Sequence, residues 1–379
     1  MRAIELFAGG GGLSVALKSN QINPSVMVEW DRYACATLRN NFLKANSTTE
    51  IFEGDIRNYD FTSFENKVEL VTGGPPCQPF SLGGKHKGFN DERDLFAEAT
   101  RAISEVKPKA FIFENVKGLT RRLFAEYFEY IYLQMTYPLL RRKKGESWII
   151  HWKKLEKYHT SNKLSDLQYQ VVYRVLNSAD YGVPQKRERI FFVGFRSDIS
   201  VNWSFPEVTH SKEALEYSKW VTGDYWEKHN INIPKISKGK NGYQFQELFK
   251  PEKKPWLTVR DSISNLPDPR ENHNIKNHEY KGNAKQYKGH TGSFLDEPAK
   301  TIKAGVHGVP GGENMLVDEK GKARYFSVRE AARIQTFPDH YSFVGSWTES
   351  LRQIGNAVPV KLAANISDSV KKALLKSKF

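Results

Sequence analysis

The sequence predicts an α/β fold with a doubly wound, mostly parallel sheet and a smaller, loop-rich domain. Residues 1–116 alternate short apolar runs with helical patterns, which is typical of parallel strands joined by right-handed crossovers. Four consecutive glycines, Gly9–Gly12, follow the first apolar run directly and allow a tight turn into a helix. Residues 198–325 are polar, with weak periodicity and many turn residues, which indicates the second domain.

Short apolar runs mark the strands expected in the parallel part of the sheet: Ala3–Phe7, Ser25–Glu29, Glu50–Phe52, Val68–Thr72 and Ala110–Glu114. Helical patterns lie between them at Leu13–Ser19, Tyr33–Phe42 and Leu95–Val106. Two longer runs, Tyr169–Asn177 and Arg189–Arg196, are expected to be antiparallel strands at the sheet edge. A last helix is expected from Pro359 to about Leu375, with Pro359 in its first turn.

The composition is that of a soluble globular protein, with 39% hydrophobic and 26% charged residues. No run approaches the roughly 20 apolar residues of a membrane span, and a motif begins almost at Met1, so we expect no signal peptide and a cytoplasmic location. Cys35 and Cys77 are the only cysteines, which argues against structural zinc and a disulfide-stapled fold. The net charge of +14 favours a polyanionic partner, with surface lysines kept for solubility as the alternative.

Cys77 lies in a loop, Gly73–Ser81, that follows an apolar strand and holds prolines on both sides of the thiol. Prolines fix the backbone, so this loop has a defined shape, and we expect Cys77 to be a nucleophile. Glu114 follows the next apolar strand, where partial burial would raise its pKa and let it hold a proton. A charged residue that merely leaves a strand is the alternative for Glu114.

Acidic residues follow the second and third strands in a pattern that suits a nucleotide-like cofactor. Glu29 comes twenty residues after Gly9, a spacing typical of an acid that accepts hydrogen bonds from ribose. Asp55 follows the third strand and can accept from an adenine amino group, while Phe7 and Trp30 offer flat surfaces to a purine. Ser14 stands where a dinucleotide site has its third glycine, which favours S-adenosylmethionine over a dinucleotide.

These residues closely resemble the cytosine-C5 DNA methyltransferase family, of the bacterial restriction–modification type. The resemblance extends over nearly the whole chain except the middle region. It rests on six ordered motifs: Glu5–Ser14, Gly74–Ser81, Glu114–Val116, Gln185–Arg189, Arg329–Pro338 and Gln353–Pro359.

The resemblance implies an S-adenosylmethionine-dependent methyltransferase fold and DNA (cytosine-5-)-methyltransferase activity. It implies that Cys77 attacks cytosine C6, that Glu114 holds N3 and the amino group, and that Arg189 and Arg187 secure O2. The residues that it places around S-adenosylmethionine are Phe7, Gly9, Gly11, Glu29, Trp30, Asp55, Ile56, Pro76 and Asn356. No metal site is expected.

The resemblance also implies double-stranded DNA as the partner, with the cytosine flipped out of the duplex. Residues 1–197 and 340–379 would form the catalytic and cofactor-binding domain, and 198–339 the target-recognition domain with its return segment. The expected DNA contacts are Ser81, Lys85 and Lys87 in a mobile loop, and Thr301, Lys303 and His307 in the second domain. We expect a nucleoid-associated protein that is monomeric on DNA and works with a restriction endonuclease without a stable complex.

Some positions depart from the family pattern: Glu5 replaces a usual Asp, Thr336 a Gly, Ala357 a Ser and Val360 a Pro. Residues 139–157 form an insertion that carries a basic run and two tryptophans, and such runs are most often solvated faces.

Three rival hypotheses explain less of the sequence. The tRNA-methylating branch of the family has a Cys-Phe-Thr signature that this chain lacks. A catalytically silent DNA-binding subunit would not be expected to retain Cys77, Glu114 and Arg189 together. A nicotinamide oxidoreductase would account neither for the proline-flanked thiol nor for the basic middle region.

Overall fold

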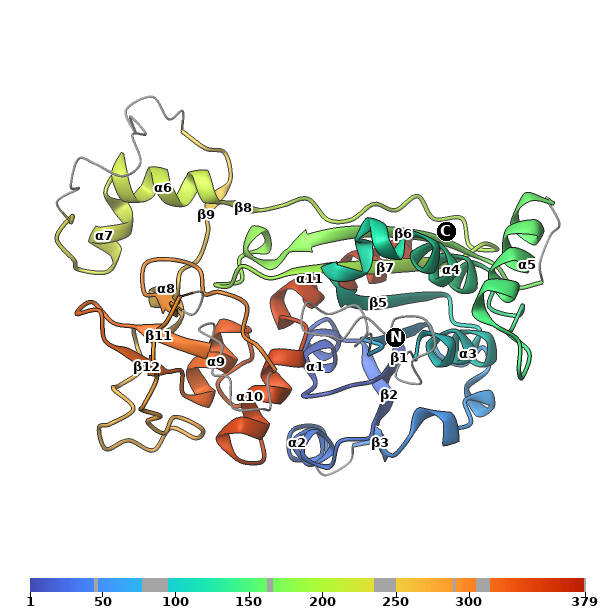
Figure 1. The fold of residues 1–379 in the computed structure, drawn as a ribbon, viewed down its shortest axis with the longest axis horizontal. Coiled ribbons are helices and arrows are strands. Elements are labelled where there is room, and N and C mark those ends of the chain that lie inside the picture. Colours follow the sequence, from blue (N-terminus) through green and yellow to red (C-terminus); the bar gives the residue numbers. More distant parts are fainter. Residues whose placement is uncertain are drawn as a thin grey trace. The chain divides into compact units, whose positions relative to one another are not determined.

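The structure is a computed structural model, and its contacts divide the chain into two units (Figure 1). The first unit comprises 1–176, 188–206 and 337–379, and the second comprises 177–187 and 207–336. This division differs from the expected domain limits in that 177–187 belong to the second unit, whereas 198–206 and 337–339 belong to the first. The residues described are 1–43, 47–76, 95–161, 166–234, 250–288, 291–304 and 314–377.

The first unit contains a seven-stranded sheet in the order β3-β2-β1-β4-β5-β7-β6. The four pairings from β3 to β5 are parallel, and β7 is antiparallel to β5. This confirms the predicted fold class. The order reverses between β1 and β4, the place where such sheets bind ligands at the carboxyl ends of the strands. The strands are β1 (Arg2–Leu6), β2 (Asn23–Glu29), β3 (Glu50–Glu53), β4 (Leu70–Gly73), β5 (Ala110–Val116), β6 (Tyr169–Asn177) and β7 (Glu188–Arg196).

The expected helices of the first unit are confirmed, and Pro359 is the one correction. It is the N-cap of the last helix, which begins at Val360, because its extended backbone precedes the first helical turn. The α-helices of this unit are α1 (Gly12–Ser19), α2 (Arg32–Phe42), α3 (Phe96–Val106), α4 (Ala125–Thr136), α5 (Trp148–Thr160), α10 (Trp347–Asn356) and α11 (Val360–Lys376). Short 3₁₀ turns lie at Ile56–Asn58, Thr62–Phe64, Lys117–Thr120 and Arg122–Phe124.

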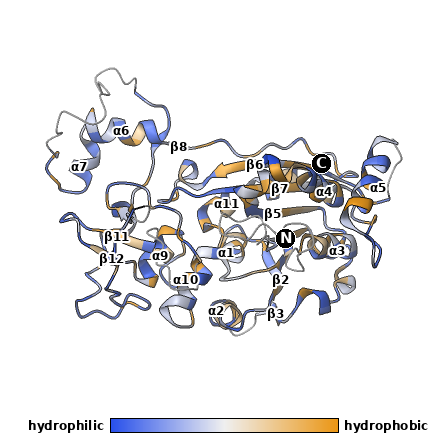
Figure 2. Ribbon diagram, viewed as in Figure 1, coloured by the Kyte–Doolittle hydropathy of each residue, from blue (hydrophilic) through white to orange (hydrophobic). Residues whose placement is uncertain are grey.

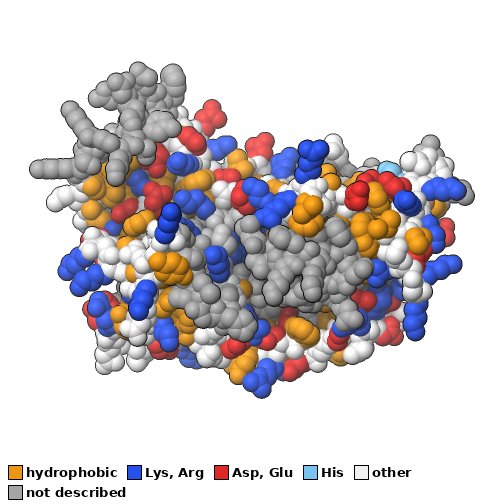
Figure 3. Space-filling view, in the orientation of Figure 1, with side chains coloured by type: hydrophobic (Ala, Val, Ile, Leu, Met, Phe, Trp, Pro, Cys, Tyr) orange, Lys and Arg blue, Asp and Glu red, His pale blue; other side chains and the backbone are white. Residues whose placement is uncertain are grey.

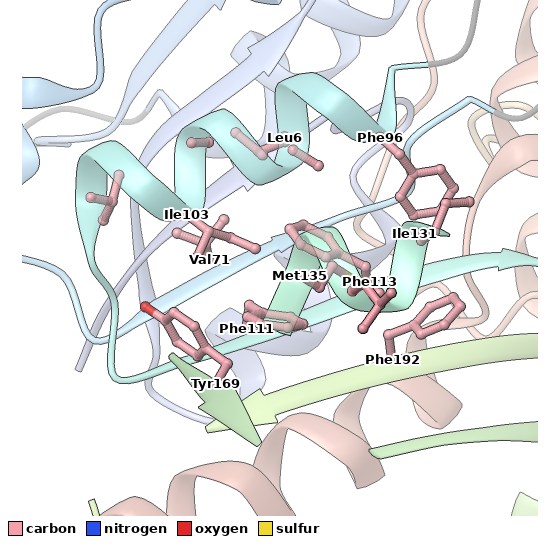
Figure 4. Packing of buried hydrophobic residues seen from close by; sticks show 14 of the residues in the cluster. Leu6, Val71, Phe96, Ile103, Phe111, Phe113, Ile131, Met135, Tyr169 and Phe192 are labelled. Atoms are coloured by element: carbon pink, nitrogen blue, oxygen red, sulfur yellow. The ribbon is translucent and has the colours of Figure 1, made fainter. Parts of the chain in front are cut away.

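One face of the sheet carries the main hydrophobic core. Side chains alternate along each strand, so Leu6, Val71 and Phe111 point to the same face, where they meet Phe96 and Ile103 of α3 (Figure 4). Burial of this apolar surface provides most of the stability of such a layer. Figure 2 shows the apolar residues concentrated in the sheet strands, while the second unit is mostly hydrophilic.

The opposite face of the sheet packs against α1, which in turn packs against α11. Glu5 lies on this face, in register with Met27 of β2 and Thr72 of β4. The Ser14 hydroxyl of α1 reaches both the Glu5 carboxyl and the Met27 sulfur. A polar cluster therefore lies beneath the turn that joins β1 to α1.

The insertion at 139–157 is part of the core of the first unit. Trp148, His151 and Leu155 of α5 are spaced to lie on one helix face and are buried against α4. The His151 Nε2–H donates to the Leu140 carbonyl at 2.8 Å, so Nδ1 accepts from the Tyr130 hydroxyl at 3.0 Å. The Arg141 Nε donates to the Ser104 hydroxyl near the end of α3. The chain continues from this end of α3 into the amino end of β5. The insertion therefore lies at the amino ends of the parallel strands, away from the carboxyl ends that carry the predicted site.

The second unit is built from short elements held by side-chain caps. Thr258 and Asp261 form a capping box at one helix, and Ser327 and Glu330 form another. A short 3₁₀ turn lies at Ser178–Tyr181. The strands and α-helices are β8 (His210–Ser211), α6 (Lys212–Trp220), α7 (Asp224–Lys228), β9 (Lys254–Pro255), α8 (Val259–Ile263), β10 (Ser293–Phe294), β11 (Met315–Val317), β12 (Ala323–Tyr325) and α9 (Val328–Ile334).

Candidate active site

The turn from β1 to α1 has an unusual backbone. Phe7 has φ 54° and Gly9 has φ 53°, and the α1 N-cap Gly11 has φ 79°. A left-handed conformation costs a residue with a side chain about 1 kcal/mol, so Phe7 is held there by its surroundings. Gly9 and Gly11 meet the same requirement without this cost.

The glycines of this turn also allow another segment to approach closely. A Cβ at Gly11 would lie 2.5 Å from the Tyr341 hydroxyl, and one at Gly12 would lie 2.4 Å from the Val358 carbonyl oxygen. The Tyr341 hydroxyl donates to the Gly10 carbonyl at 2.9 Å. Glycines are therefore needed here because residues 341–358 pack closely against this turn. The sequence did not predict this packing.

Glu29 ends β2 and is only 8% exposed. Its Oε2 accepts from the Gly9 N–H at 2.7 Å, and its Oε1 accepts from the N–H groups of Trp30 and Asp31, both at 2.9 Å. Burial raises the pKa of Glu29, and these three backbone donors act against that rise. The carboxyl group is thus fixed in orientation beside the glycine turn.

Aromatic and acidic groups lie next to Glu29. The Trp30 side chain is 77% exposed, which leaves its ring available to a ligand. The Gly54 N–H donates to the Glu29 carbonyl at 2.9 Å, so the end of β3 lies beside the end of β2. Asp55 follows, and its carboxylate pairs with the Arg57 guanidinium at 2.5 Å, which lowers the pKa of Asp55. Ile56 is buried beside it.

Glu114 and Arg189 form an ion pair between neighbouring strands. The Glu114 Oε1 lies 2.8 Å from the Arg189 Nε, and Glu114 is 7% exposed. Burial lowers the pKa of Arg189, and Glu114 opposes that change. The predicted burial of Glu114 is confirmed, and the proton expected on it stays a prediction.

The chain before Cys77 is fixed beside this pair. A Cβ at Gly74 would lie 3.4 Å from the Glu114 Oε2. The Asn115 Nδ2 donates to the Pro75 carbonyl at 2.9 Å within the core, so β5 holds the loop that contains Pro76 and leads to Cys77. The motif Glu114–Val116 includes Asn115, but the sequence indicated no role for this residue. Its position one residue after a candidate catalytic acid is the signal that could have singled it out.

Several predicted residues lie outside the described residues: Cys77, Ser81, Lys85, Lys87 and His307. Asn356 is exposed at the end of α10. Cys35 is buried, which raises the pKa of its thiol to about 12 and makes it unreactive near neutral pH.

In the second unit, the predicted arginine and recognition segments run side by side. Arg187 is 1% exposed, and its Nη1 donates to the Ile302 carbonyl at 3.1 Å. The Thr301 hydroxyl donates to the Lys186 carbonyl at 2.8 Å, and the Lys186 N–H donates to the Ala299 carbonyl at the same distance. The Lys303 side chain is exposed. Arg187 therefore holds the 301–303 segment, and its contact with cytosine stays a prediction.

The described residues contain no group of three or more His, Cys, Asp or Glu side chains that could hold a metal ion. In the same ranges, no helix is long and apolar enough to cross a membrane. Figure 3 shows Lys and Arg side chains interspersed with acidic ones rather than gathered into one patch on the visible face of the first unit.

The chain is similar to curated methyltransferases over nearly its whole length. It is 34% identical to the Type II methyltransferase M.PspPI of Psychrobacter sp. (strain TA137), over 97% of this chain and 78% of that protein. It is 32% identical to the Type II methyltransferase M.Eco47II of Escherichia coli, with the same coverage. The Neisseria gonorrhoeae Type II methyltransferase M.NgoPII is 27% identical, over 99% of this chain and 96% of that protein.

Solved structures share the fold. The S. pombe Dnmt2 methyltransferase structure matches with a TM-score of 0.58 and 17% identity, over 99% of both chains. Residues 1–137 and 149–372 match the model of the family described as C-5 cytosine-specific DNA methylase, which leaves out only part of the α5 insertion and the last residues. This match and the curated relatives show that the chain belongs to the C-5 cytosine-specific DNA methylase family and is a DNA (cytosine-5-)-methyltransferase.

Proposed function

We propose that this enzyme methylates C5 of a flipped cytosine in a specific short duplex sequence through a covalent adduct with Cys77. The observation that carries the proposal is the buried Glu114–Arg189 pair, 2.8 Å apart, next to the Gly74–Pro76 backbone that leads into Cys77. A thiolate that follows this backbone could attack a cytosine ring. The carboxylate and the guanidinium could hold the polar atoms of the same base.

The residues at the ends of β1, β2 and β3 fit S-adenosylmethionine. Glu29 is held by backbone donors and can accept from ribose hydroxyls. The exposed Trp30 ring offers a surface for adenine, with Asp55 and Ile56 on the adjoining strand end. Gly9 and Gly11 let the backbone approach the ligand, and we place Phe7, Pro76 and Asn356 around it. S-adenosylmethionine, when bound, supplies an electrophilic methyl group on a sulfonium.

The proposed reaction uses the thiolate of Cys77 to activate the base. The thiolate attacks C6, a bond forms between Sγ and C6, and the electron pair of the C5–C6 double bond moves onto C5. C5 then takes the methyl group, and the electron pair of the broken S–CH₃ bond stays on sulfur. Water takes the C5 proton, the double bond forms again, and the bond between Sγ and C6 breaks to release the thiolate.

Other groups of this chain hold the base during these steps. Glu114 would bind N3 and the amino group of the cytosine, while Arg189 would bind O2 and stabilise the charge that develops there. Asn115 positions the Pro75 backbone and through it the Cys77 loop. Arg187 keeps the 301–303 segment in place and is the second candidate for O2.

DNA binding would use the second unit together with the loop after Cys77. We propose Thr301, Lys303 and His307 as contacts of a target-recognition domain, and Ser81, Lys85 and Lys87 as contacts of the loop. The net charge of +14 supports attraction to phosphates, and groove contacts would supply specificity. The Type II names of the relatives support protection of host DNA beside a restriction endonuclease. We propose no stable complex with that endonuclease and a monomer on DNA.

The test is transfer of label from S-adenosylmethionine to separate pools of duplex DNA and tRNA. Label in DNA at cytosine C5, mapped to one short sequence, is expected. Label in tRNA alone, or none in DNA that contains all short palindromes, would overturn the proposal. Replacement of Cys77 by Ala should abolish transfer while S-adenosylhomocysteine still binds, and an active C77A protein would refute the adduct.

A further inference from the structure

Glu5 is a buried acid that the proposed reaction does not use. It is 1% exposed and is the penultimate residue of β1, two residues before the glycine turn begins at Phe7. Its Oε2 accepts a hydrogen bond from the Ser14 hydroxyl in the first turn of α1. This contact joins the strand before the glycine turn to the helix after it.

The groups around Glu5 come from each element packed on this face of the sheet. Met27 of β2 and Thr72 of β4 are its neighbours in register, and the Met27 sulfur lies 3.4 Å from the Ser14 hydroxyl. Glu29 raises the pKa of Glu5 by charge repulsion. The buried Tyr341 hydroxyl, which faces this cluster, donates to the Gly10 carbonyl. Burial is the largest cause of the rise of the Glu5 pKa, to about 8, and the hydrogen bond from Ser14 acts against that rise.

We propose that Glu5 is a positioning residue that keeps the glycine turn in the shape that binds the cofactor, through its hydrogen bond with Ser14. The inference rests on the proposed function, because it takes the Phe7–Gly11 turn as part of the cofactor site. Glu5 does not touch the ligand in this account. It acts through the turn, whose Gly9 N–H orients the Glu29 carboxylate.

Burial raises the pKa of Glu5 more than the hydrogen bond donated by Ser14 lowers it, so the neutral form prevails at neutral pH. Its folded pKa lies above its ordinary value, so the folded protein holds a proton there at neutral pH and loses it as the pH passes about 8. Ionisation then places a second negative charge in a buried site that also holds Glu29. If only the protonated form has the binding shape, affinity for the cofactor falls about tenfold for each pH unit above that value.

The experiment measures the dissociation constant of S-adenosylhomocysteine by calorimetry from pH 6.5 to 9.5, with thermal unfolding of the free protein over the same range. Wild-type affinity should fall about fivefold between pH 8 and pH 9, and the fall should approach tenfold per pH unit above that. Glu5→Gln keeps the size and a hydrogen-bonding end but cannot ionise, so its affinity should not fall and should exceed that of wild type at pH 9. Ser14→Ala should bind more weakly at every pH. Glu129→Gln, at an exposed carboxyl on α4, is the control and should follow wild type.

Equal pH profiles for wild type and Glu5→Gln, or unchanged binding by Ser14→Ala, would overturn the inference. The unfolding data separate this failure from that of the proposed cofactor. Between pH 5.5 and 8 the folded state holds a proton that the unfolded state has lost, so wild-type stability should fall as pH rises and that of Glu5→Gln should fall less. A protein that shows this difference but binds no S-adenosylhomocysteine would overturn the cofactor assignment, and with it the positioning role of Glu5.

Discussion

Two buried carboxylates at the same edge of the sheet are held in different ways. Glu114 on β5 pairs with the Arg189 guanidinium of the adjacent antiparallel strand. Glu29 at the end of β2 is held by three backbone N–H groups. A side-chain ion pair places opposite charges where a base with both donors and acceptors would bind. Backbone donors fix a carboxylate in direction and leave it to accept from neutral hydroxyls. The difference predicts that Glu114 serves catalysis and Glu29 serves cofactor affinity.

The largest effect is expected for Glu114→Gln. The amide cannot supply the charge that holds the base and leaves the buried Arg189 unpaired, so kcat should fall by about 10²–10⁴-fold. Binding of S-adenosylhomocysteine should stay within about threefold of wild type. Single-turnover methylation of a mapped DNA target and calorimetry measure the two quantities.

The matched control for this variant is Glu188→Gln, which removes a carboxylate of β7 from its exposed pair with Lys117. It should keep its methylation rate. A Glu114→Gln enzyme that loses cofactor affinity while kcat persists would reverse the assignment of the two carboxylates.

Glu29→Gln should show the opposite pattern. A charged acceptor contributes about 1.5–3 kcal/mol per hydrogen bond, so the dissociation constant of S-adenosylhomocysteine should rise about 10–100-fold. At saturating cofactor, kcat should change less than tenfold. Calorimetry with steady-state rates at several cofactor concentrations separates the effects, and unchanged affinity would remove Glu29 from the proposed site.

Asn115→Ala tests the support of the Cys77 loop. Loss of the donor to the buried Pro75 carbonyl should cost about 1–3 kcal/mol of unfolding free energy, measured in urea. The rate of the chemical step should fall as well, while S-adenosylhomocysteine affinity persists. A variant with wild-type kcat would show that this bond stabilises the fold without positioning the nucleophile.

The smallest effect is expected for the exposed Lys117–Glu188 pair. Both side chains are about half exposed, so solvent screens their attraction, and Glu188→Gln should change stability by less than about 0.5 kcal/mol. Urea unfolding at low and high salt measures it. A loss of unfolding free energy as large as that of Asn115→Ala would show that burial does not decide how much each contact contributes to stability.

The sequence predicted the parallel strands, the glycine turn and the burial of Glu114 because these depend on local patterns. It did not predict the Arg189 contact, which depends on the register of β7 against β5, or the Asn115 bond, which joins residues forty positions apart. The packing of α5 was missed because a basic run hid the buried spacing of Trp148, His151 and Leu155. In the second unit, short capped elements give little periodicity to recognise.

The covalent adduct with Cys77 can be trapped on a mapped duplex target that carries 5-fluorocytosine at the methylated position. Fluorine at C5 cannot leave as a proton does, so the Sγ–C6 bond should persist after methyl transfer. A denaturation-resistant protein–DNA complex should form only with S-adenosylmethionine, with the DNA attached to the peptide that contains Cys77. Methylation of the ordinary target without any such complex would contradict the adduct.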